Sequence, residues 1–231
     1  MVKKIVVLTG AGVSAESGLS TFRDAGGLWE GHNVMDVASP EGWRNNKELV
    51  LDFYNQRRRQ LKDAKPNDAH IALTELENKY DVTIVTQNVD DLHERAGSSK
   101  IIHLHGELNK ARSTVDESIV YDLDGSDITV NCRCEKGSQL RPHVVWFGEM
   151  VPMMEAAIKA VLSADILIVI GTSLAVYPAA SLLEFVKNDM PVYLIDPVKP
   201  ENYLNQRNIN FIQEKATKGT RELTEKLLNV A

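Results

Sequence analysis

The amino-acid sequence predicts an α/β fold in which a doubly wound parallel sheet carries a smaller inserted lobe. Three runs of β-branched and aliphatic residues are bounded by turn or polar residues, and a fourth run follows them. Such runs, apolar on both faces, are typical of strands buried in a parallel sheet, and the helical patterns between them predict crossover connections. The runs are KKIVVLTG, DVTIVTQN, ADILIVIGTS and PVYLIDP, and the helical patterns include NDAHIALTELENKY and PAASLLEFVKN.

The first predicted strand leads directly into GAGVSAESG, in which Gly10, Gly12 and Ala15 fit the pattern G-x-G-x-x-[GA]. Between a strand and a helix, this Rossmann-like pattern gives a tight turn and lets the backbone and a helix amino terminus approach a pyrophosphate. By itself the pattern leaves dinucleotide binding and a merely tight turn as equal alternatives. An ordinary dehydrogenase is disfavoured, because STFRDAGGLW stands where an acidic residue would end a second strand.

Two segments interrupt the alternation of strands and helices. Residues 25–65 contain helical patterns without a clear strand, and residues 110–141 are polar with short strand-like pieces. We expect both insertions to form the smaller lobe of a single domain spanning residues 1–231, with a ligand cleft between the lobes. The large lobe then comprises approximately residues 1–24, 66–109 and 142–231.

The charge balance disfavours a broad nucleic-acid or membrane surface, because 26 Lys and Arg residues face 32 Asp and Glu residues, giving a net charge of -6. No apolar run is long enough to span a membrane. Cys132 and Cys134 are too close in sequence for a framework disulfide and are interpreted as reduced thiols, metal ligands or neither. We therefore expect a cytoplasmic protein; its oligomeric state is not predicted.

Five motifs follow one another along the chain: GAGVSAESGLSTFRDAGGLW, TQNVD, LHGEL, RPHVVWFGE and GTSLAVYPAA. In this order they resemble the sirtuin family of NAD-dependent protein deacylases. The resemblance implies a catalytic domain that cleaves nicotinamide from NAD and passes the acyl group of a modified lysine to the ribose. Its products would be nicotinamide, free lysine and O-acyl-ADP-ribose, and its partners acylated-lysine proteins or peptides.

The resemblance assigns the general base to His105. A histidine suits this role because its unperturbed pKa lies near neutrality. The alternative is a structural, hydrogen-bonded histidine, which is the role we expect for His103. The resemblance also places Asn88 in the reacting pocket. Asn88 follows a predicted strand, where the sites of α/β proteins form; the alternative is an ordinary turn, which Asn favours.

For NAD the resemblance implies contacts from the glycine loop, the covering loop and the ends of later strands. Asp196 stands where relatives often carry Asn near the adenosine ribose, which leaves that contact open. The expected cofactor-binding residues are Gly10, Ala11, Gly12, Ser14, Ala15, Glu16, Phe22, Arg23, Trp29, Gln87, Asn88, Asp90, Gly171, Thr172, Ser173, Asp196 and Ala216.

The segment ELVLDFYNQRRRQL predicts a helix in which Arg57 falls on the apolar stripe and Tyr54 lies one turn before it. A charge on a buried stripe invites an anionic partner, whereas Arg58 and Arg59 are expected to be solvated. This Tyr-x-x-Arg arrangement resembles the class III sirtuins, which accept succinyl, malonyl or glutaryl groups, and Ala25 matches a small residue leaving room for the longer acyl chain. Alternatively, Arg57 pairs with an internal carboxylate.

Two further expectations follow from the resemblance. Val145, Trp146 and Phe147 match the loop that holds the substrate peptide as an added strand and lines the lysine tunnel, the alternative being a core strand. Many sirtuins also hold a structural zinc with two Cys-x-x-Cys pairs. Here Ser113 replaces the first cysteine, so Cys132 and Cys134 do not supply the four ligands that zinc requires, and no zinc site is expected.

The predicted activity is therefore NAD-dependent lysine deacylation, with desuccinylation and demalonylation favoured and some deacetylation. A plain deacetylase is the first alternative. A mono-ADP-ribosyltransferase or a non-enzymatic NAD-binding scaffold would use the same cleft.

Overall fold

The computed structural model describes residues 2–20, 28–29, 31–172, 174, 177–199 and 209–229. Its central element is a six-stranded parallel sheet with the strand order β11-β10-β9-β1-β4-β5. The four predicted apolar runs all form strands of this sheet, which confirms the α/β class. The strands are β1 (Lys4–Thr9), β4 (Asp81–Thr86), β5 (Ile101–His103), β9 (Ile166–Ile170), β10 (Val192–Ile195) and β11 (Ile209–Ile212).

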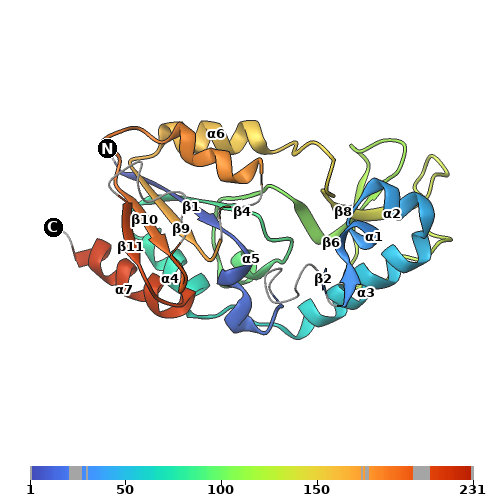
Figure 1. Cartoon of the computed structure of the whole chain (residues 1–231), viewed down its shortest axis with the longest axis horizontal. Helices are drawn as coiled ribbons and strands as arrows, with labels where there is room; N and C mark the ends of the chain where they lie inside the picture. The colour runs from blue at the N-terminus through green and yellow to red at the C-terminus, as the bar shows by residue number, and fades with distance from the viewer. Residues whose placement is uncertain are drawn as a thin grey trace.

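Helices cover both faces of the sheet (Figure 1). Alternate residues of β1 point to opposite faces, so Val6 and Leu8 pack with one helical layer while Ile5 and Val7 pack with the other. The first layer contains α6 (Met154–Ser163) and η4 (Ala179–Phe185), and the second contains α4 (Asp68–Leu76) and α7 (Ala216–Asn229). The pattern PAASLLEFVKN thus forms a 3-10 helix, not the regular helix that its periodicity predicts.

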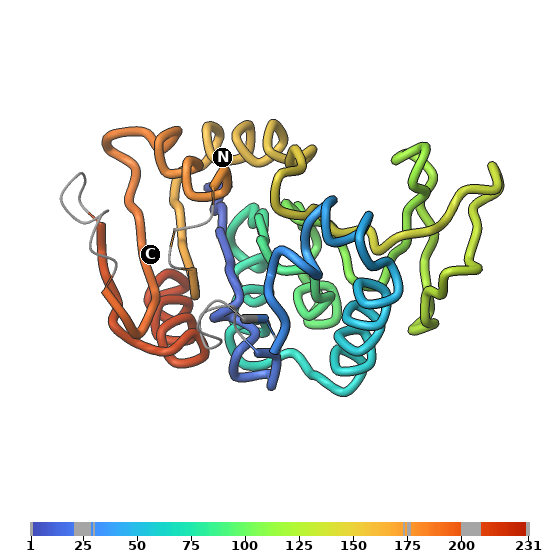
Figure 2. Tube along the Cα trace, turned by 45° about the vertical axis from the view of Figure 1, so that its right-hand side comes forward, coloured from blue at the N-terminus to red at the C-terminus, as the bar shows by residue number. Residues whose placement is uncertain are grey.

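A separate antiparallel sheet has the strand order β7-β6-β8 and packs with the helices that precede α4. These elements lie at the end of the molecule away from α7 and β11 (Figures 1 and 2). The boundaries of the small lobe stay a prediction; the sheet itself runs from Gly106 to Val144. Its strands and the accompanying elements are β6 (Gly106–Ser113), β7 (Val120–Asp122), β8 (Leu140–Val144), β2 (Leu28–Trp29), β3 (His32–Asn33), α1 (Val34–Val37), α2 (Pro40–Asn45) and α3 (Lys47–Asp63).

The expectation that Arg58 is solvated is wrong. Arg58 is 2% exposed and donates hydrogen bonds to the carbonyl oxygens of Ser126 (3.1 Å) and Leu108 (2.8 Å) and to Asn55 Oδ1 (2.6 Å). Burial lowers the pKa of its guanidinium to about 10. The helix α3 is covered on a second side by residues far along the chain, which its own periodicity does not reveal. Arg59 is exposed, as predicted.

Replacing Arg58 by methionine is expected to lower the free energy of unfolding by about 3 kcal/mol, because buried carbonyl groups lose their donors while the side-chain volume is kept. Urea denaturation measures this change. The matched control is Arg59→Met, at a side chain 54% exposed that pairs with Asp127, and should change stability by less than about 0.5 kcal/mol. Equally small losses of stability in the two variants would show that the Arg58 guanidinium does not hold α3 to the segments that carry Leu108 and Ser126.

Candidate active site

The glycine loop after β1 is held against the end of β9. Gly10 N donates to Ile170 O (3.0 Å) and Gly12 N to Gly171 O (2.9 Å). A Cβ on Gly12 would lie 2.6 Å from Gly171 Cα, and Gly171 itself has a φ of +60°. Glycine is therefore required here by the approach of two backbones.

The segment after the loop differs from the predicted helix start. Ala11–Val13 and Ala15–Ser17 form two short 3-10 helices, η1 and η2. The long helix amino terminus that a Rossmann-like loop usually offers to a phosphate is therefore replaced by tight turns.

Polar groups from the loops after β1 and β4 meet at the carboxyl edge of the sheet. Ser14 Oγ donates to Asp90 Oδ2 (2.9 Å), and Asn88 Nδ2 donates to Ser14 Oγ (3.1 Å) and Gly10 O (3.2 Å). Burial raises the pKa of Asp90, opposed by hydrogen bonds from the Leu92 N–H and Ser14. The predicted residues Ser14, Asn88 and Asp90 thus form one buried cluster.

Gln87 links this cluster to the neighbouring strand end and to His105. The side-chain amide of Gln87 donates to Thr172 Oγ1 (3.1 Å). Its backbone carbonyl oxygen lies 2.9 Å from His105 Nδ1. A carbonyl oxygen only accepts, so Nδ1 carries the ring proton and Nε2 keeps its lone pair. Burial lowers the pKa of His105, with the Gln87 hydrogen bond opposing it. Neutral His105 therefore presents a proton acceptor.

Gly106 fixes the turn that follows this histidine. Its φ is +80°, and a Cβ there would lie 2.1 Å from His143 O. The chain can consequently turn directly from His105 into β6 against β8.

His103 has different neighbours. Its Nε2 lies 2.5 Å from Glu94 Oε1 and its Nδ1 lies 3.4 Å from Asn88 O. Burial disfavours the charged ring, yet the hydrogen bond and charge of Glu94 outweigh it and raise the pKa of His103. The two histidines therefore differ in the direction of their pKa shifts, and the structural role expected for His103 stays a prediction.

The segment after β8 lies beside His105. Val145 N donates to His105 O (2.9 Å), and Phe147 N donates to Ala38 O (3.0 Å). Phe147 is 41% exposed, whereas Trp146 is 2% exposed. Of the predicted peptide-binding residues, Phe147 thus faces outward and Trp146 belongs to the core.

Tyr54 and Arg57 lie one turn apart on α3, near this segment. Tyr54 is 1% exposed, its hydroxyl accepts a hydrogen bond from Trp146 Nε1 (3.0 Å), and burial raises the pKa of the phenol well above its ordinary value. Arg57 is half-buried, with its guanidinium 5.1 Å from the ring centroid of Trp29. The neutral Tyr54 hydroxyl and the Arg57 cation therefore come from successive turns of α3.

Two further predicted cofactor residues, Glu16 and Asp196, have hydrogen-bond partners of their own. Glu16 Oε2 accepts hydrogen bonds from Thr217 N (3.1 Å) and Thr217 Oγ1 (2.8 Å), next to Ala216 at the start of α7. Asp196 is buried and accepts from Val198 N (2.9 Å). Glu16 thus caps α7 in this structure. The predicted residues Phe22, Arg23, Ala25 and Ser173 lie outside the described residues.

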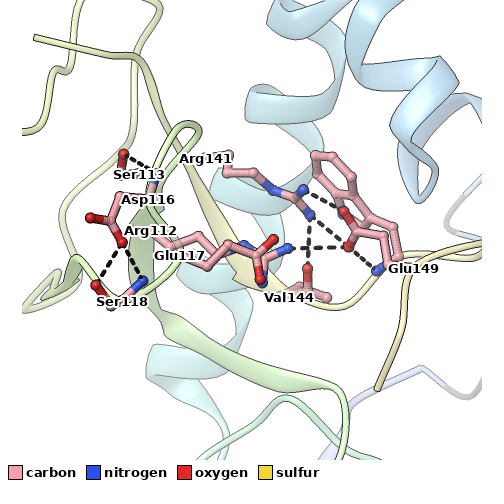
Figure 3. A network of polar contacts seen from close by, with 9 residues as sticks. Arg112, Ser113, Asp116, Glu117, Ser118, Arg141, Val144 and Glu149 are labelled. Carbon is pink, nitrogen blue, oxygen red and sulfur yellow. Dashed lines mark hydrogen bonds and ion pairs between the residues drawn. The ribbon is translucent and has the colours of Figure 1, made fainter. Parts of the chain in front are cut away.

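A charged network of Arg112, Arg141 and Glu149 was not predicted from the sequence (Figure 3). It contacts Trp146 through Arg141 and Glu149. Arg141 contacts Glu149 through both terminal nitrogens (2.6 and 3.1 Å), and Arg112 reaches the same carboxylate (3.3 Å). Both Arg141 and Glu149 stand in the motif RPHVVWFGE, but there each reads as an ordinary surface charge. Arg112 joins this pair because β6 and β8 are neighbours in the sheet.

The two cysteines have polar neighbours. Cys134 Sγ lies 3.1 Å from Ser138 Oγ, which lies 2.9 Å from Ser113 Oγ, and hydrogen bonds from both serines lower the pKa of the Cys134 thiol to about 7. Within the described ranges, no group of three or more His, Cys, Asp or Glu side chains is arranged to hold a metal ion. No helix among these residues has the length and apolar character to cross a membrane.

Comparison with known proteins gives consistent matches over this architecture. The Sir2 family model matches residues 10–178. The chain is 54% identical to an NAD-dependent protein deacylase of Helicobacter pylori (strain J99 / ATCC 700824), covering 99% of this chain and 97% of the relative. A Bacteroides thetaiotaomicron protein of the same name is 52% identical, covering 98% of each chain. A solved Sir2 homologue in complex with ADP-ribose superposes with a TM-score of 0.89 at 40% identity, covering 100% of this chain and 95% of that one.

Proposed function

This chain belongs to the Sir2 family and is an NAD-dependent protein deacylase, and on that premise we propose that it prefers lysines carrying acidic acyl groups. Succinyl and malonyl groups are the proposed substrates, with glutaryl of the same class and deacetylation as a side activity. The observation that carries this proposal is the placement of the Tyr54 hydroxyl and the Arg57 guanidinium one helical turn apart on α3.

The buried polar cluster suits NAD. Ser14, Asn88 and Asp90 offer hydroxyl, amide and carboxylate groups for a ribose and a carboxamide, and in our proposal the loop of Gly10 and Gly12 lets a pyrophosphate approach its backbone. When bound, NAD supplies a ribose carbon that becomes electrophilic as nicotinamide leaves. In our proposal these residues orient that ribose, and Gln87 holds the neighbouring histidine.

His105 is proposed to act as the general base. Because its Nδ1 proton is directed at Gln87 O, its Nε2 can take the proton of a ribose hydroxyl. The lowered pKa keeps the ring unprotonated at neutral pH, so it is available to accept a proton. In this proposal the proton acceptor and the ribose-binding cluster lie at the same edge of the sheet.

Tyr54 and Arg57 are proposed to bind the distal carboxylate of the acyl group. Burial keeps the Tyr54 hydroxyl protonated, so it can donate, and a guanidinium suits a carboxylate in charge and shape. An acetyl group has no carboxylate to use these donors. The expected result is selectivity for acidic acyl groups beyond the general deacylase activity.

The substrate is proposed to be an acylated-lysine segment of a protein, bound beside residues 145–147. Phe147 exposes apolar surface there, and Val145 bonds directly to the backbone of His105. The net charge of -6 supports a protein partner over nucleic acid or an anionic membrane. The free thiols of Cys132 and Cys134 support a reducing compartment such as the cytoplasm.

The test compares kcat/KM on succinyl-lysine and acetyl-lysine peptides of one sequence. The wild type should prefer succinyl-lysine, and Arg57→Met should lower succinyl-lysine turnover selectively by about 30-fold or more, because truncating one side of a desolvated charge pair costs at least about 2 kcal/mol. Arg59→Met, at the exposed neighbouring position, is the matched control and should leave both rates unchanged.

An equal loss on both peptides would make Arg57 structural, and a wild type favouring acetyl-lysine would make the protein a plain deacetylase. Mass spectrometry of the products separates the remaining alternative. Free O-acyl-ADP-ribose is expected, whereas ADP-ribose attached to the protein would indicate a mono-ADP-ribosyltransferase.

A further inference from the structure

The Tyr54 hydroxyl has a fixed hydrogen-bond direction on one side. Trp146 Nε1 lies 3.0 Å from the hydroxyl oxygen, and an indole nitrogen only donates. Tyr54 must therefore accept this bond. Because the indole N–H approaches the hydroxyl oxygen from this side, the phenolic hydrogen is directed away from Trp146.

Trp146 is held in position by contacts to its ring and to its backbone. The Arg141 guanidinium lies over its ring, 3.2 Å from the centroid, and the Trp43 ring packs against it with centroids 5.7 Å apart. Its backbone N–H donates to Glu149 Oε2 (2.8 Å). Since the same carboxylate binds Arg141 through two contacts, one acidic group fixes both the backbone and the stacked cation.

The same network also fixes the backbone that leads to Trp146. Arg141 also donates to Val144 O (2.9 Å), and Figure 3 shows Arg141, Glu149 and Val144 converging beside Arg112. Trp146 is only 2% exposed, so its indole offers little surface to a substrate. Its polar atom is instead directed at one hydroxyl.

We propose that Trp146 is a positioning residue for acyl selectivity: its indole N–H turns the Tyr54 hydroxyl into an oriented donor for the distal carboxylate of an acidic acyl group. This inference rests on the proposed function. Donation by the indole also polarises the hydroxyl, which strengthens the bond that Tyr54 gives. Trp146 thus acts through Tyr54.

The test is a double-mutant cycle with Trp146→Phe and Tyr54→Phe, followed by the succinyl-to-acetyl ratio of kcat/KM. Trp146→Phe should lower this ratio roughly three- to ten-fold, as expected for one neutral hydrogen bond. In the Tyr54→Phe background it should leave the ratio unchanged, because the hydroxyl to be oriented is gone. An additive loss in the double variant, or a single-variant ratio equal to the wild type, overturns the inference.

Trp43→Phe is the matched control, because it trims the ring that packs on Trp146 without touching the hydrogen bond to Tyr54. Its ratio should equal that of the wild type, even if both rates fall. A ratio lowered as much as in Trp146→Phe would show that packing alone sets selectivity and would overturn the inference.

An NMR measurement tests the hydrogen bond independently of acyl preference and of how well the Trp146 variant folds. In Tyr54→Phe, the indole N–H proton of Trp146 should shift upfield, and an unchanged resonance would overturn the inference. If Arg57→Met and Tyr54→Phe both leave the ratio unchanged, the acidic-acyl proposal fails as well. If they lower it and Trp146→Phe does not, only the role of Trp146 fails.

Discussion

Replacing His105 by alanine is expected to lower kcat for deacylation by about 10²- to 10⁴-fold, the usual contribution of a positioned general base. The Gln87 carbonyl fixes the tautomer that leaves Nε2 free to accept a proton, and alanine removes that atom without changing the backbone. Steady-state turnover of an acylated peptide measures the loss. NAD affinity, measured by calorimetry, should be largely retained, and near-normal turnover would remove His105 from the reaction.

The wild-type pH profile provides a second check on this histidine. Only the neutral ring accepts a proton, and burial lowers its pKa below the ordinary 6.5. The kcat/KM for deacylation should therefore hold as pH falls past 6.5 and decline only at more acidic values. A decline centred above 6.5 would point to a different group, such as His103, whose pKa is raised.

Glu149→Ala is expected to lower the free energy of unfolding by about 3 to 5 kcal/mol, because it leaves two buried cations without their shared anion. The side chains of Arg112 and Arg141 are 5% and 9% exposed. Urea denaturation at neutral pH measures the change. The matched control is Glu117→Ala, which removes an exposed carboxylate 3.6 Å from Arg112 and should cost less than about 1 kcal/mol.

Acid should weaken the same network. Burial opposes ionisation of Glu149, but hydrogen bonds from Arg141 and the Trp146 N–H outweigh it and lower the pKa of the carboxyl group. Its contribution to stability is therefore present above the unfolded pKa, about 4.3, and is lost as pH falls through the lower folded value. Equal losses in the Glu149 and Glu117 variants at neutral pH would contradict a central role for Glu149.

The main sheet could be predicted because strands buried on both faces are continuous apolar runs, which can be recognised in the sequence. The apolar runs ILIVI and IVVL each lie within a central strand of the sheet. β5 is only three residues long, and the run PAASLLEFVKN has helical spacing yet tightens into η4. Short edge strands and 3-10 helices depend on their neighbours, so the local pattern alone could not define them.

The candidate site was predictable where one motif carries its own chemistry and harder to predict where distant segments meet. Asn88 and Asp90 follow a buried strand, and they join the polar cluster expected there. Arg58 has an ordinary helix-surface context in sequence, but its carbonyl partners come from residues 50 and 68 positions later. Glu16 likewise binds Thr217, which no local pattern indicates.

The contact between Gly12 and Gly171 couples the cofactor loop to the order in which the chain folds. The loop is shaped by hydrogen bonds to the end of β9, and Ile5 of β1 pairs with Ile166, far along the chain. Closing so long a segment costs entropy before its contacts repay it, which makes such pairing slow to form. An amino-terminal fragment ending before β9 therefore lacks the template for its own glycine turn. Dinucleotide affinity should consequently appear late in refolding, as a signal that the two distant strands have paired.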